Sequence, residues 1–587
     1  MKRNIRTVCL RAGVVILFSL ASVSCRKMFD LAPEDALELD QAYRNVYDAD
    51  AAIVGLYGKV VNIADRYMVL NELRGDLEDV TPNADQYLVQ LSTHSVSDTN
   101  PWADPRPFYE IIINCNDALT NFDKMLQGKR ISQADYDLRY SEVGAVRSWL
   151  YLQLGIQYGS VPYITEPLAT IAELKDETKY PRISFDELLD KLAQFTERLP
   201  NKDPMPSGTS LVTTMDSYNT MKMFINKYVL LGDLYLWKGD WSGAAKYYHK
   251  MMTYSKVQYS DPNSENTFNS YTLGNNPSRI DNANWINIFS AAYGERYSNY
   301  ETIWQIPFDK KFSPYNPLVQ LYSSGTENYK IKPSALSIKR WRDEVRTDGT
   351  PYDTYRGEGK SYVMRQGQAQ INKLLPNYNS ASPFDVDGKW ILYRSALVHL
   401  RMAETANRDG RDKLAYALMN VGVRTTYTPK VAPTNVTNIM QSFDPNPDYY
   451  FDARFGNSPT FRAHFAYNQG VRGRVSLPAM KVDSTKFFDM SEPGSETKAV
   501  TDRAGLTLAM EDLIVREAGL ELAYEGNRWP DLLRIARRRE KEAAGTGKKF
   551  LMESVAAKFT EAGHPVPQGV TKLGSDVSSW YLPFKWR

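Results

Sequence analysis

The chain has 587 residues, of which 43% are hydrophobic and 24% are charged. This length and apolar content are sufficient for a large buried core and exclude a chain that is disordered throughout. Four of the 71 basic residues and none of the 69 acidic residues precede Cys25, so the part from Cys25 onward carries 67 basic against 69 acidic residues. A balance this close to neutral, without long basic runs, excludes a predicted nucleic-acid-binding surface.

The first 24 residues have the pattern of an export signal. Basic residues are followed by an apolar run from Ala12 to Leu20, and small residues then lead to Cys25. The apolar run is too short to span a bilayer as a helix. We therefore predict a lipoprotein signal peptide over residues 1–24, with Cys25 as the acylated first residue of the mature protein. Ordinary secretory cleavage, with Cys25 incidental, is the alternative. Because no later segment has the composition of a membrane span, acyl chains on Cys25 are the expected anchor.

Four segments have the pattern of two amphipathic helices joined by a short turn. The clearest runs from Phe224 to Met252, where Gly232, Gly239 and Tyr248 follow the spacing of a tetratricopeptide repeat. The predicted units lie near residues 141–199, 220–256, 390–425 and 508–540. One pair cannot bury its apolar face alone, so the pairs are expected to stack. We therefore predict a mainly α fold: four tetratricopeptide-like helix pairs form a right-handed scaffold within a single domain over residues 25–587.

Three long segments lack helical periodicity, near residues 60–105, 257–389 and 427–503. They are rich in Asn, Ser, Tyr and Pro, and the run from Glu301 to Phe308 is a strand candidate. Loops of this length in a compact chain are usually functional surfaces or disordered. The aromatic content of 12% favours order, so we predict that these segments form a large irregular face that binds a ligand.

Three carboxylates follow one another at helical spacing near the C-terminus. Glu517, Glu521 and Glu525 are four residues apart and would share one helix face. Such a pair of carboxylates could act as acid and base. The nearby Arg528 and Arg534, and arginines of neighbouring repeats, favour ion pairs instead, so we interpret the three residues as a structural brace.

No pattern in the sequence predicts catalysis or a metal. The five histidines never approach one another at the spacing of metal ligands, and no nucleophile elbow, phosphate-binding loop or dinucleotide fingerprint occurs. Asp385 and Asp387 are interpreted as turn residues, with a calcium loop as the alternative. We therefore expect no enzyme activity and no cofactor; a glycosidase hidden in the irregular segments is the alternative.

Aromatic residues concentrate between Asp281 and Trp304. Planar rings with polar tips stack against sugar faces or peptide side chains, and their polar atoms add directional contacts. The candidate ligand-binding residues are Trp285, Tyr293, Tyr297 and Tyr300 here, and Tyr67, Arg74 and Asp76 in the earlier irregular segment. Packing in the core is the alternative for the rings, and a solvated loop is the alternative for the charged residues.

Short patterns follow one another along nearly the whole chain. The most specific comprises Glu517, Glu521, Leu522, Tyr524, Glu525, Gly526, Arg528, Trp529, Asp531, Leu532 and Arg534; others include Trp102, Tyr109, Asn116, Glu142, Arg147, Tyr151, Gly159, Pro162, Arg394, Glu404, Asn407, Gly410, Asn420, Arg424 and the closing Trp580 to Phe584. In this order, behind a lipoprotein signal, they resemble the SusD/RagB family of outer-membrane nutrient-binding lipoproteins. Two departures are Arg26 and Lys27, where such surface lipoproteins often carry acidic residues, and Pro530, which interrupts the usual run from tryptophan to aspartate.

The resemblance implies a lipid-anchored protein of the outer membrane that faces the cell exterior. It would bind an oligomeric nutrient, in the first place a glycan, and deliver it as a hinged lid to a SusC-like TonB-dependent transporter. An oligopeptide-binding lid and a tetratricopeptide interaction scaffold without transport are the alternatives. The resemblance also implies a structural brace that cross-links the helix pairs, formed by Arg147, Arg394, Glu404, Arg424, Glu521, Glu525, Arg528, Trp529 and Asp531.

Overall fold

The computed structural model describes residues 43–168, 173, 175–176, 178–215, 218–253, 285–290, 301–311, 313–376, 378–428, 444–453, 465, 468–491 and 498–586. Helices dominate this part of the chain, and its strands form only small two-stranded sheets. The predicted mainly α fold class is thereby confirmed.

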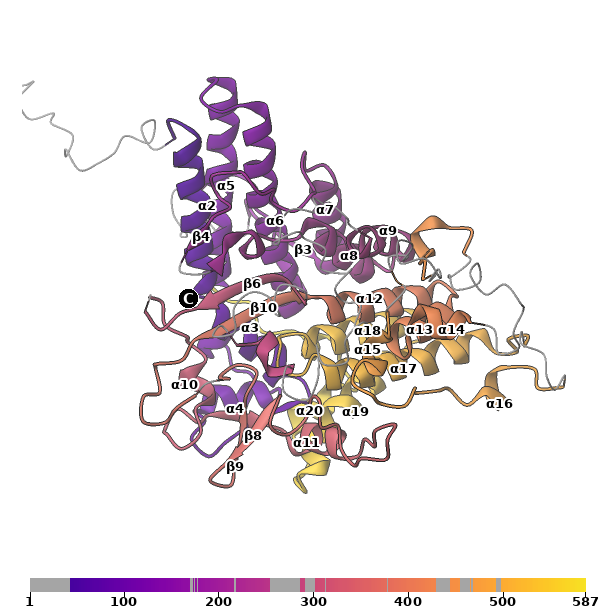
Figure 1. Ribbon diagram of the computed structural model, residues 1–587. Helices are drawn as coiled ribbons and strands as arrows, with labels where there is room; N and C mark the ends of the chain where they lie inside the picture. The colour runs from indigo at the N-terminus through magenta and orange to yellow at the C-terminus, as the bar shows by residue number, and fades with distance from the viewer. Residues whose placement is uncertain are drawn as a thin grey trace, which may run out of the picture.

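Long helices near the N-terminal end form the first layer of the fold. α2 (Val46–Val61), α5 (Arg106–Gln127) and α6 (Gln133–Tyr158) stand side by side in the upper part of Figure 1. α6 begins after Ser132, whose hydroxyl accepts a hydrogen bond from the backbone N–H of Asp135 at 3.1 Å. This is the usual capping contact of a helix start. Every residue of α6 from 141 onward is buried, because α5 and α7 cover it.

The later helices continue the stack. Their bounds are α7 (Phe185–Glu197), α8 (Lys227–Lys238), α9 (Trp241–Met252), α12 (Ser395–Arg408), α13 (Asp412–Met419), α17 (Arg503–Glu521), α18 (Arg528–Glu542) and α19 (Thr546–Glu561). α7 packs against α8, α8 pairs with α9, and α9 packs against α12, which in turn contacts α13 and α17. In the α8–α9 pair, a Cβ atom at Gly232 would lie 2.4 Å from the ring of Tyr248. Glycine therefore permits the close helix approach that the repeat spacing predicts.

Five antiparallel strand pairs are present in the described residues. They are β1 (Glu78–Val80) with β7 (Ile331–Pro333), β2 (Ser160–Pro162) with β3 (Arg182–Ser184), β4 (Thr214–Met215) with β5 (Tyr218–Asn219), β6 (Thr302–Phe308) with β10 (Gly388–Arg394), and β8 (Tyr362–Arg365) with β9 (Gln368–Ile371). In the longest ribbon, Gly388 of β10 lies opposite Phe308 and Trp390 opposite Ile306. β6 coincides with the predicted strand candidate, and the ribbon crosses the middle of the molecule in Figure 1.

The segment near residues 60–105 contains more regular structure than its sequence indicates. It forms α3 (Ala64–Met68), a π-helical turn η2 (Val69–Leu73), β1, α4 (Gln86–Ser92) and the 3₁₀ turn η3 (Pro101–Ala103). All residues of η2 are buried, as are Arg74 and Asp76 after it. This part of the predicted irregular face is therefore an internal element of the fold.

The remaining short elements lie on the loops and at the C-terminal end. They are η5 (Thr220–Met223), η7 (Trp285–Ile288), α10 (Val319–Tyr322), α11 (Ala335–Arg342), α14 (Gly422–Tyr427), η9 (Pro447–Tyr449), α15 (Gly470–Gly473), α16 (Ser484–Phe487), α20 (Gln568–Lys572) and η10 (Val577–Trp580). One continuous apolar core joins the helices, and a second small cluster surrounds Trp285. Over the described ranges, no helix combines the length and the apolar character that a bilayer span requires.

Candidate functional site

The structure places the described ligand-binding candidates inside the protein. Tyr67, Arg74, Asp76 and Trp285 are each at most 6% exposed. Cys25 and the other three candidates, Tyr293, Tyr297 and Tyr300, lie outside the described residues. The four described side chains therefore have protein atoms, and not solvent, as their immediate surroundings.

The polar candidates have internal partners. Arg74 donates to Oε1 of Gln157 at 2.7 Å and to the backbone carbonyl of Trp580 at 2.6 Å, and its guanidinium lies 4.1 Å from the ring centre of Trp529. Asp76 accepts hydrogen bonds from Arg528 at 2.9 Å and Arg340 at 2.7 Å. Burial alone would raise the pKa of the Asp76 carboxyl, but the two guanidinium groups hold that pKa well below its usual value.

The two aromatic candidates pack against protein groups. The ring of Tyr67 stacks on Trp149, with 5.7 Å between ring centres and 30° between the planes. The indole of Trp285 lies 5.1 Å from the guanidinium of Arg474 and 5.5 Å from that of Arg394. A cation over an indole face is an attractive contact that strengthens away from water, so Trp285 covers a buried group of charges.

These charges form a glutamate–arginine cluster, which consists of Glu301, Arg356, Lys373, Arg394, Arg472, Arg474, Glu517, Glu521 and Glu525. Its members are all buried. Glu521 accepts from Arg394 at 2.7 Å, from Arg356 at 3.0 Å and from Arg474. Glu525 accepts from Arg394 at 2.6 Å and from Lys373 at 2.6 Å. The cluster joins α17 to β10 and to the loop segments that carry the other cations.

The partners of these carboxylates agree with the expected ones in part. Glu517 and Glu521 lie on α17, but Glu525 lies in the turn after it, so the prediction that all three share one helix face is wrong for Glu525. Arg394, an arginine of a neighbouring repeat unit, binds both Glu521 and Glu525. Arg528 binds Asp76, and Arg534 binds Glu404 at 2.6 Å and Asp531 at 2.9 Å. Arg528 does cross-link the last helix pair, because it donates to the backbone carbonyl of Val515 on α17 at 2.9 Å. Glu521 and Glu525 instead bind cations of other segments. A helix-face pattern shows which residues point together, but not which segment meets them.

The other brace candidates lie at separate places in the scaffold. Arg147 donates to Oδ1 of Asn116 at 2.8 Å and covers the ring of Phe195 at 4.3 Å. Trp529 is fully buried beneath Arg74, and Arg424 is half-buried on α14. Burial opposes ionisation of Glu404, yet Arg534 and Arg538 lower its pKa to about 2.

Sequence reasoning missed a second buried polar group beside η2. Oε1 of Glu72 accepts from the backbone N–H groups of Gly526 at 2.7 Å and Asn527 at 2.9 Å, so this carboxyl caps the start of α18. Oε2 of Glu72 is buried, and so is Oε1 of Glu78. Neither oxygen finds a hydrogen-bond partner in the part of the chain that the structure describes. The ammonium of Lys558 donates to the carbonyls of Leu73 at 3.0 Å and Glu78 at 3.1 Å. No sequence pattern links positions so far apart.

Burial raises the pKa of Glu72 from its ordinary value of 4.5 to about 7, which makes the folded state sensitive to pH. Below pH 4.5 the carboxyl is protonated in both states; between 4.5 and 7 the unfolded chain releases its proton first, so stability falls as pH rises. We expect Glu72→Gln to remove this loss, and the wild type to lose up to about 3 kcal/mol relative to the variant across this window. Urea unfolding at pH 4.5, 5.5, 6.5 and 7.5 measures the difference. If the free energy of unfolding changes with pH in the same way in both proteins, the raised pKa of Glu72 is contradicted.

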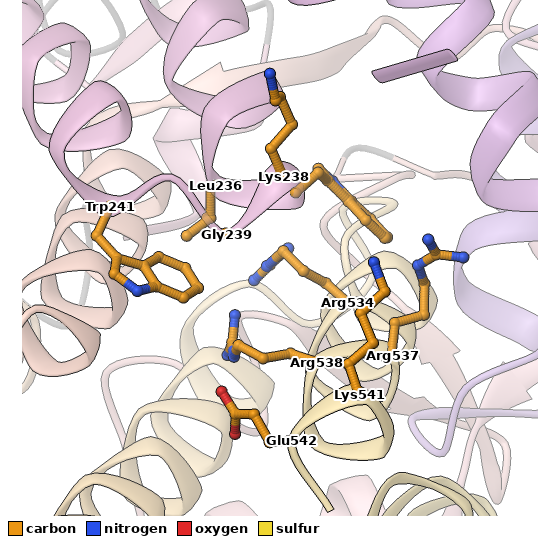
Figure 2. A pocket seen from close by; sticks show the side chains of 10 residues that line it. Leu236, Lys238, Gly239, Trp241, Arg534, Arg537, Arg538, Lys541 and Glu542 are labelled. Carbon is orange, nitrogen blue, oxygen red and sulfur yellow. The ribbon is translucent and has the colours of Figure 1, made fainter. Parts of the chain in front are cut away.

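The structure also has an open hollow of about 200 Å³ where the turn between α8 and α9 faces α18. Figure 2 shows this basic pocket, which is lined by Leu236, Trp237, Lys238, Gly239, Trp241, Arg534, Arg537, Arg538, Lys541 and Glu542. Five of these side chains are cationic, two are indoles and one is a carboxylate. In the figure, the cations of α18 rise toward the α8–α9 turn, and Trp241 closes one side.

One side of the basic pocket has a signal in the sequence. Arg534, Arg537, Arg538 and Lys541 are spaced i, i+3, i+4 and i+7, and therefore share one face of a helix. A face of four cations attracts acidic neighbours or an anionic ligand. Which helix lies opposite is set by tertiary packing and is not readable from this pattern. Among the described residues, no group of three or more potential metal ligands is gathered.

Comparison with known proteins establishes the fold. No protein-family model matches the chain, and no curated protein matches it either. Among solved structures, a SusD superfamily protein from Bacteroides thetaiotaomicron aligns with a TM-score of 0.52 and 16% identity over 90% of this chain and 97% of that chain. A second SusD superfamily protein, from Bacteroides vulgatus, aligns with a TM-score of 0.52 and 13% identity over 90% of this chain and 97% of that chain. Surface glycan-binding protein A from Bacteroides uniformis aligns with a TM-score of 0.53 and 16% identity over 92% of this chain and 96% of that chain.

These alignments define a class of helical proteins built on the same scaffold along nearly the whole chain. The protein has the SusD-like fold, which confirms at the level of the fold the resemblance that its sequence motifs carry.

Proposed function

We propose that the protein is a surface lipoprotein that binds an oligomeric nutrient, in the first place a glycan, and does not turn it over. We further propose that it delivers this nutrient, as a hinged lid, to a SusC-like TonB-dependent transporter in the outer membrane. The observation that carries the proposal is the SusD-like fold, which the chain shares over 92% of its length with the surface glycan-binding protein A of Bacteroides uniformis.

Two features of the chain support this proposal. The first 25 residues have the pattern of a lipoprotein signal that ends at Cys25, and acyl chains would hold the protein at a membrane surface. The glutamate–arginine cluster ties segments of the predicted ligand face to α17. A loop surface fixed at its base in this way offers a ligand a preformed site, which lowers the entropy cost of binding.

The membrane and partner parts of the proposal are tested by co-purification. Epitope-tagged protein is isolated from detergent-solubilised outer membranes, and the proteins that accompany it are identified by mass spectrometry. We expect a TonB-dependent barrel in near-equal amount, and we expect Cys25→Ala to release the protein from the membrane fraction. A protein that purifies alone, or that is found in the inner membrane or periplasm, would contradict the transport role and favour an interaction scaffold.

The ligand part is tested separately with the purified soluble chain that begins after Cys25. Isothermal titration with a panel of neutral oligosaccharides is expected to give saturable binding, while reducing-end assays after long incubation are expected to show no cleavage. Binding of oligopeptides in place of sugars would change the ligand class and leave the lid role intact. Release of new reducing ends would establish a glycosidase and overturn the binding-only proposal.

A further inference from the structure

We propose that the basic pocket between the α8–α9 turn and α18 binds a sugar residue that carries an anionic group, a carboxylate or a sulfate ester. This inference rests on the proposed function in one respect, because the sugar is the assumed carrier of the anion. The pocket itself is defined by the packing of the described helices, and nothing in the sequence motifs or in the structural comparisons assigns it.

The inner wall of the pocket is made of arginines that are locked in place. Arg534 donates to both carboxylate oxygens of Glu404, at 3.1 and 2.6 Å. Arg538 donates to Glu404 at 3.0 Å and to Glu511. Two-point contacts fix the plane of a guanidinium group. The Nε of Arg538 is buried and finds no acceptor within the described residues, so one donor of this wall is left unsatisfied.

The outer wall of the pocket has cations that pair with solvent-exposed carboxylates. Lys541 lies 2.8 Å from Asp186, and Lys238 lies 2.8 Å from Asp190. The side chains of Asp186 and Asp190 are 55% and 68% exposed. Exposed ion pairs of this kind contribute little to stability, about 0–1 kcal/mol. An incoming anion can therefore replace these carboxylates at small cost, whereas Glu404 is buried and keeps its arginines.

Charge alone would accept any anion, but the rings narrow the ligand class. The half-buried Trp241 lies beside the pocket with the guanidinium of Arg538 5.2 Å from its ring centre. Trp237 is buried deeper, with its ring centre 5.3 Å from that of Phe185 and 5.7 Å from the guanidinium of Arg534, so Trp241 is the ring that can meet a sugar. An indole presents a flat apolar face on which the C–H face of a sugar ring stacks, next to cations that meet a charged substituent.

The size of the pocket sets the length of the ligand portion it takes. Its volume of about 200 Å³ lies below the range of about 300–1,000 Å³ that drug-sized ligands occupy. It therefore fits one sugar residue with its charged group, and the remainder of an oligosaccharide would extend into solvent. Binding should weaken as salt concentration rises, because the outer cations are exposed and screened.

The test titrates the purified chain from residue 26 onward with four probes: galacturonic acid, galactose 6-sulfate, galactose and sodium acetate. The first two are anionic sugars, and comparison of their affinities shows whether the pocket prefers a carboxylate or a sulfate ester. Galactose lacks the charge, and acetate lacks the ring. We expect saturable binding of at least one anionic sugar, with galactose and acetate each at least roughly tenfold weaker, which corresponds to 1.4 kcal/mol. Equal binding of acetate would show a plain anion site and would overturn the inference, as would equal binding of galactose.

Variants of the outer wall give opposite expectations. Lys541→Gln should weaken binding of the anionic sugar by roughly fivefold, whereas Asp186→Asn should strengthen it, because it frees Arg537 and Lys541 from their carboxylate. Lys549→Gln on α19 and Glu187→Gln on α7 are the matched controls; their ion pairs, Lys549 to Glu553 and Lys191 to Glu187, lie outside the pocket.

A gain of affinity in Asp186→Asn cannot result from misfolding, so it keeps the inference testable even if other variants are unstable. No change in either pocket variant would overturn the inference. If Lys541→Gln loses binding of the anionic sugar but still co-purifies with the barrel and still binds neutral glycans, the pocket and the proposed function are independent of each other. Failure of the barrel co-purification with pocket binding intact would contradict only the transport role.

Discussion

Replacing Glu521 with alanine is expected to destabilise the folded protein by about 3–5 kcal/mol, the cost of breaking a buried ion pair by removing one partner. The carboxylate lies between three buried guanidinium groups, with Arg394 at 2.7 Å, Arg356 at 3.0 Å and Arg474 also in contact. Burial opposes the charge on Glu521, but these three cations hold its pKa well below the usual value. Without it, like charges face one another in a site closed to water.

The measurement is urea unfolding followed by tryptophan fluorescence at pH 7. Glu553→Ala is the matched control, because Glu553 is also a helical glutamate with a cationic partner, but it is exposed and lies 4.0 Å from Lys549. The control is expected to change stability by less than about 0.5 kcal/mol. If both variants unfold at the same urea concentration, the glutamate–arginine cluster contributes no stability. Equal stability together with lost ligand binding would reassign Glu521 to the ligand site.

Replacing Gly422 with alanine is expected to cost about 4 kcal/mol, near the upper end for single substitutions. Its φ of +82° is strained for a residue with a side chain, which accounts for about 1–2 kcal/mol. The new Cβ would also lie 1.8 Å from the backbone carbonyl oxygen of Asn468. A backbone atom cannot rotate away as a side chain can, so α14 and the segment before α15 must separate.

Gly410→Ala separates the two causes. Gly410 also has a positive φ, +76°, but a Cβ there would meet no atom within 4 Å. Its substitution is expected to cost only the conformational share, about 1–2 kcal/mol. Thermal unfolding of both variants, with circular dichroism as the signal, compares them directly. A similar loss in both would show that the contact with Asn468 yields easily and that steric overlap is unimportant.

The helix pairs could be predicted because their determinants are local. Gly232 and Tyr248 are 16 positions apart and meet across a single turn, so a repeat spacing in the sequence corresponds to a contact in the structure. The strand from Thr302 to Phe308 is similarly visible from its own composition. Signals of this kind require only that neighbouring residues face a common core.

The site could not be predicted because its determinants are distant. Arg74 and Asp76 look like solvated loop residues, since the sequence around them is rich in charged residues such as Glu72, Glu78 and Asp79. Their partners Trp580 and Arg528 come 506 and 452 positions later. For the basic pocket, the four cations of α18 and the α8–α9 turn are each predictable from the sequence, but their position opposite each other is not. Trp285 lies in an aromatic-rich stretch that resembles a ligand-binding surface. Only the positions of Arg394 and Arg474 in the structure show that it covers the glutamate–arginine cluster.

The contacts around η2 have a consequence for the order in which the chain folds. Lys558 reaches back 485 positions to the carbonyl of Leu73, and Gly526 reaches back 454 positions to Glu72. Contacts between positions so far apart slow folding, because the entropy cost of closing a long loop must be met before they form. The polar groups of η2 therefore stay hydrated while the rest of the polypeptide is still being made. The buried polar contacts around η2 can therefore form only after the residues of α18 and α19 have been synthesised.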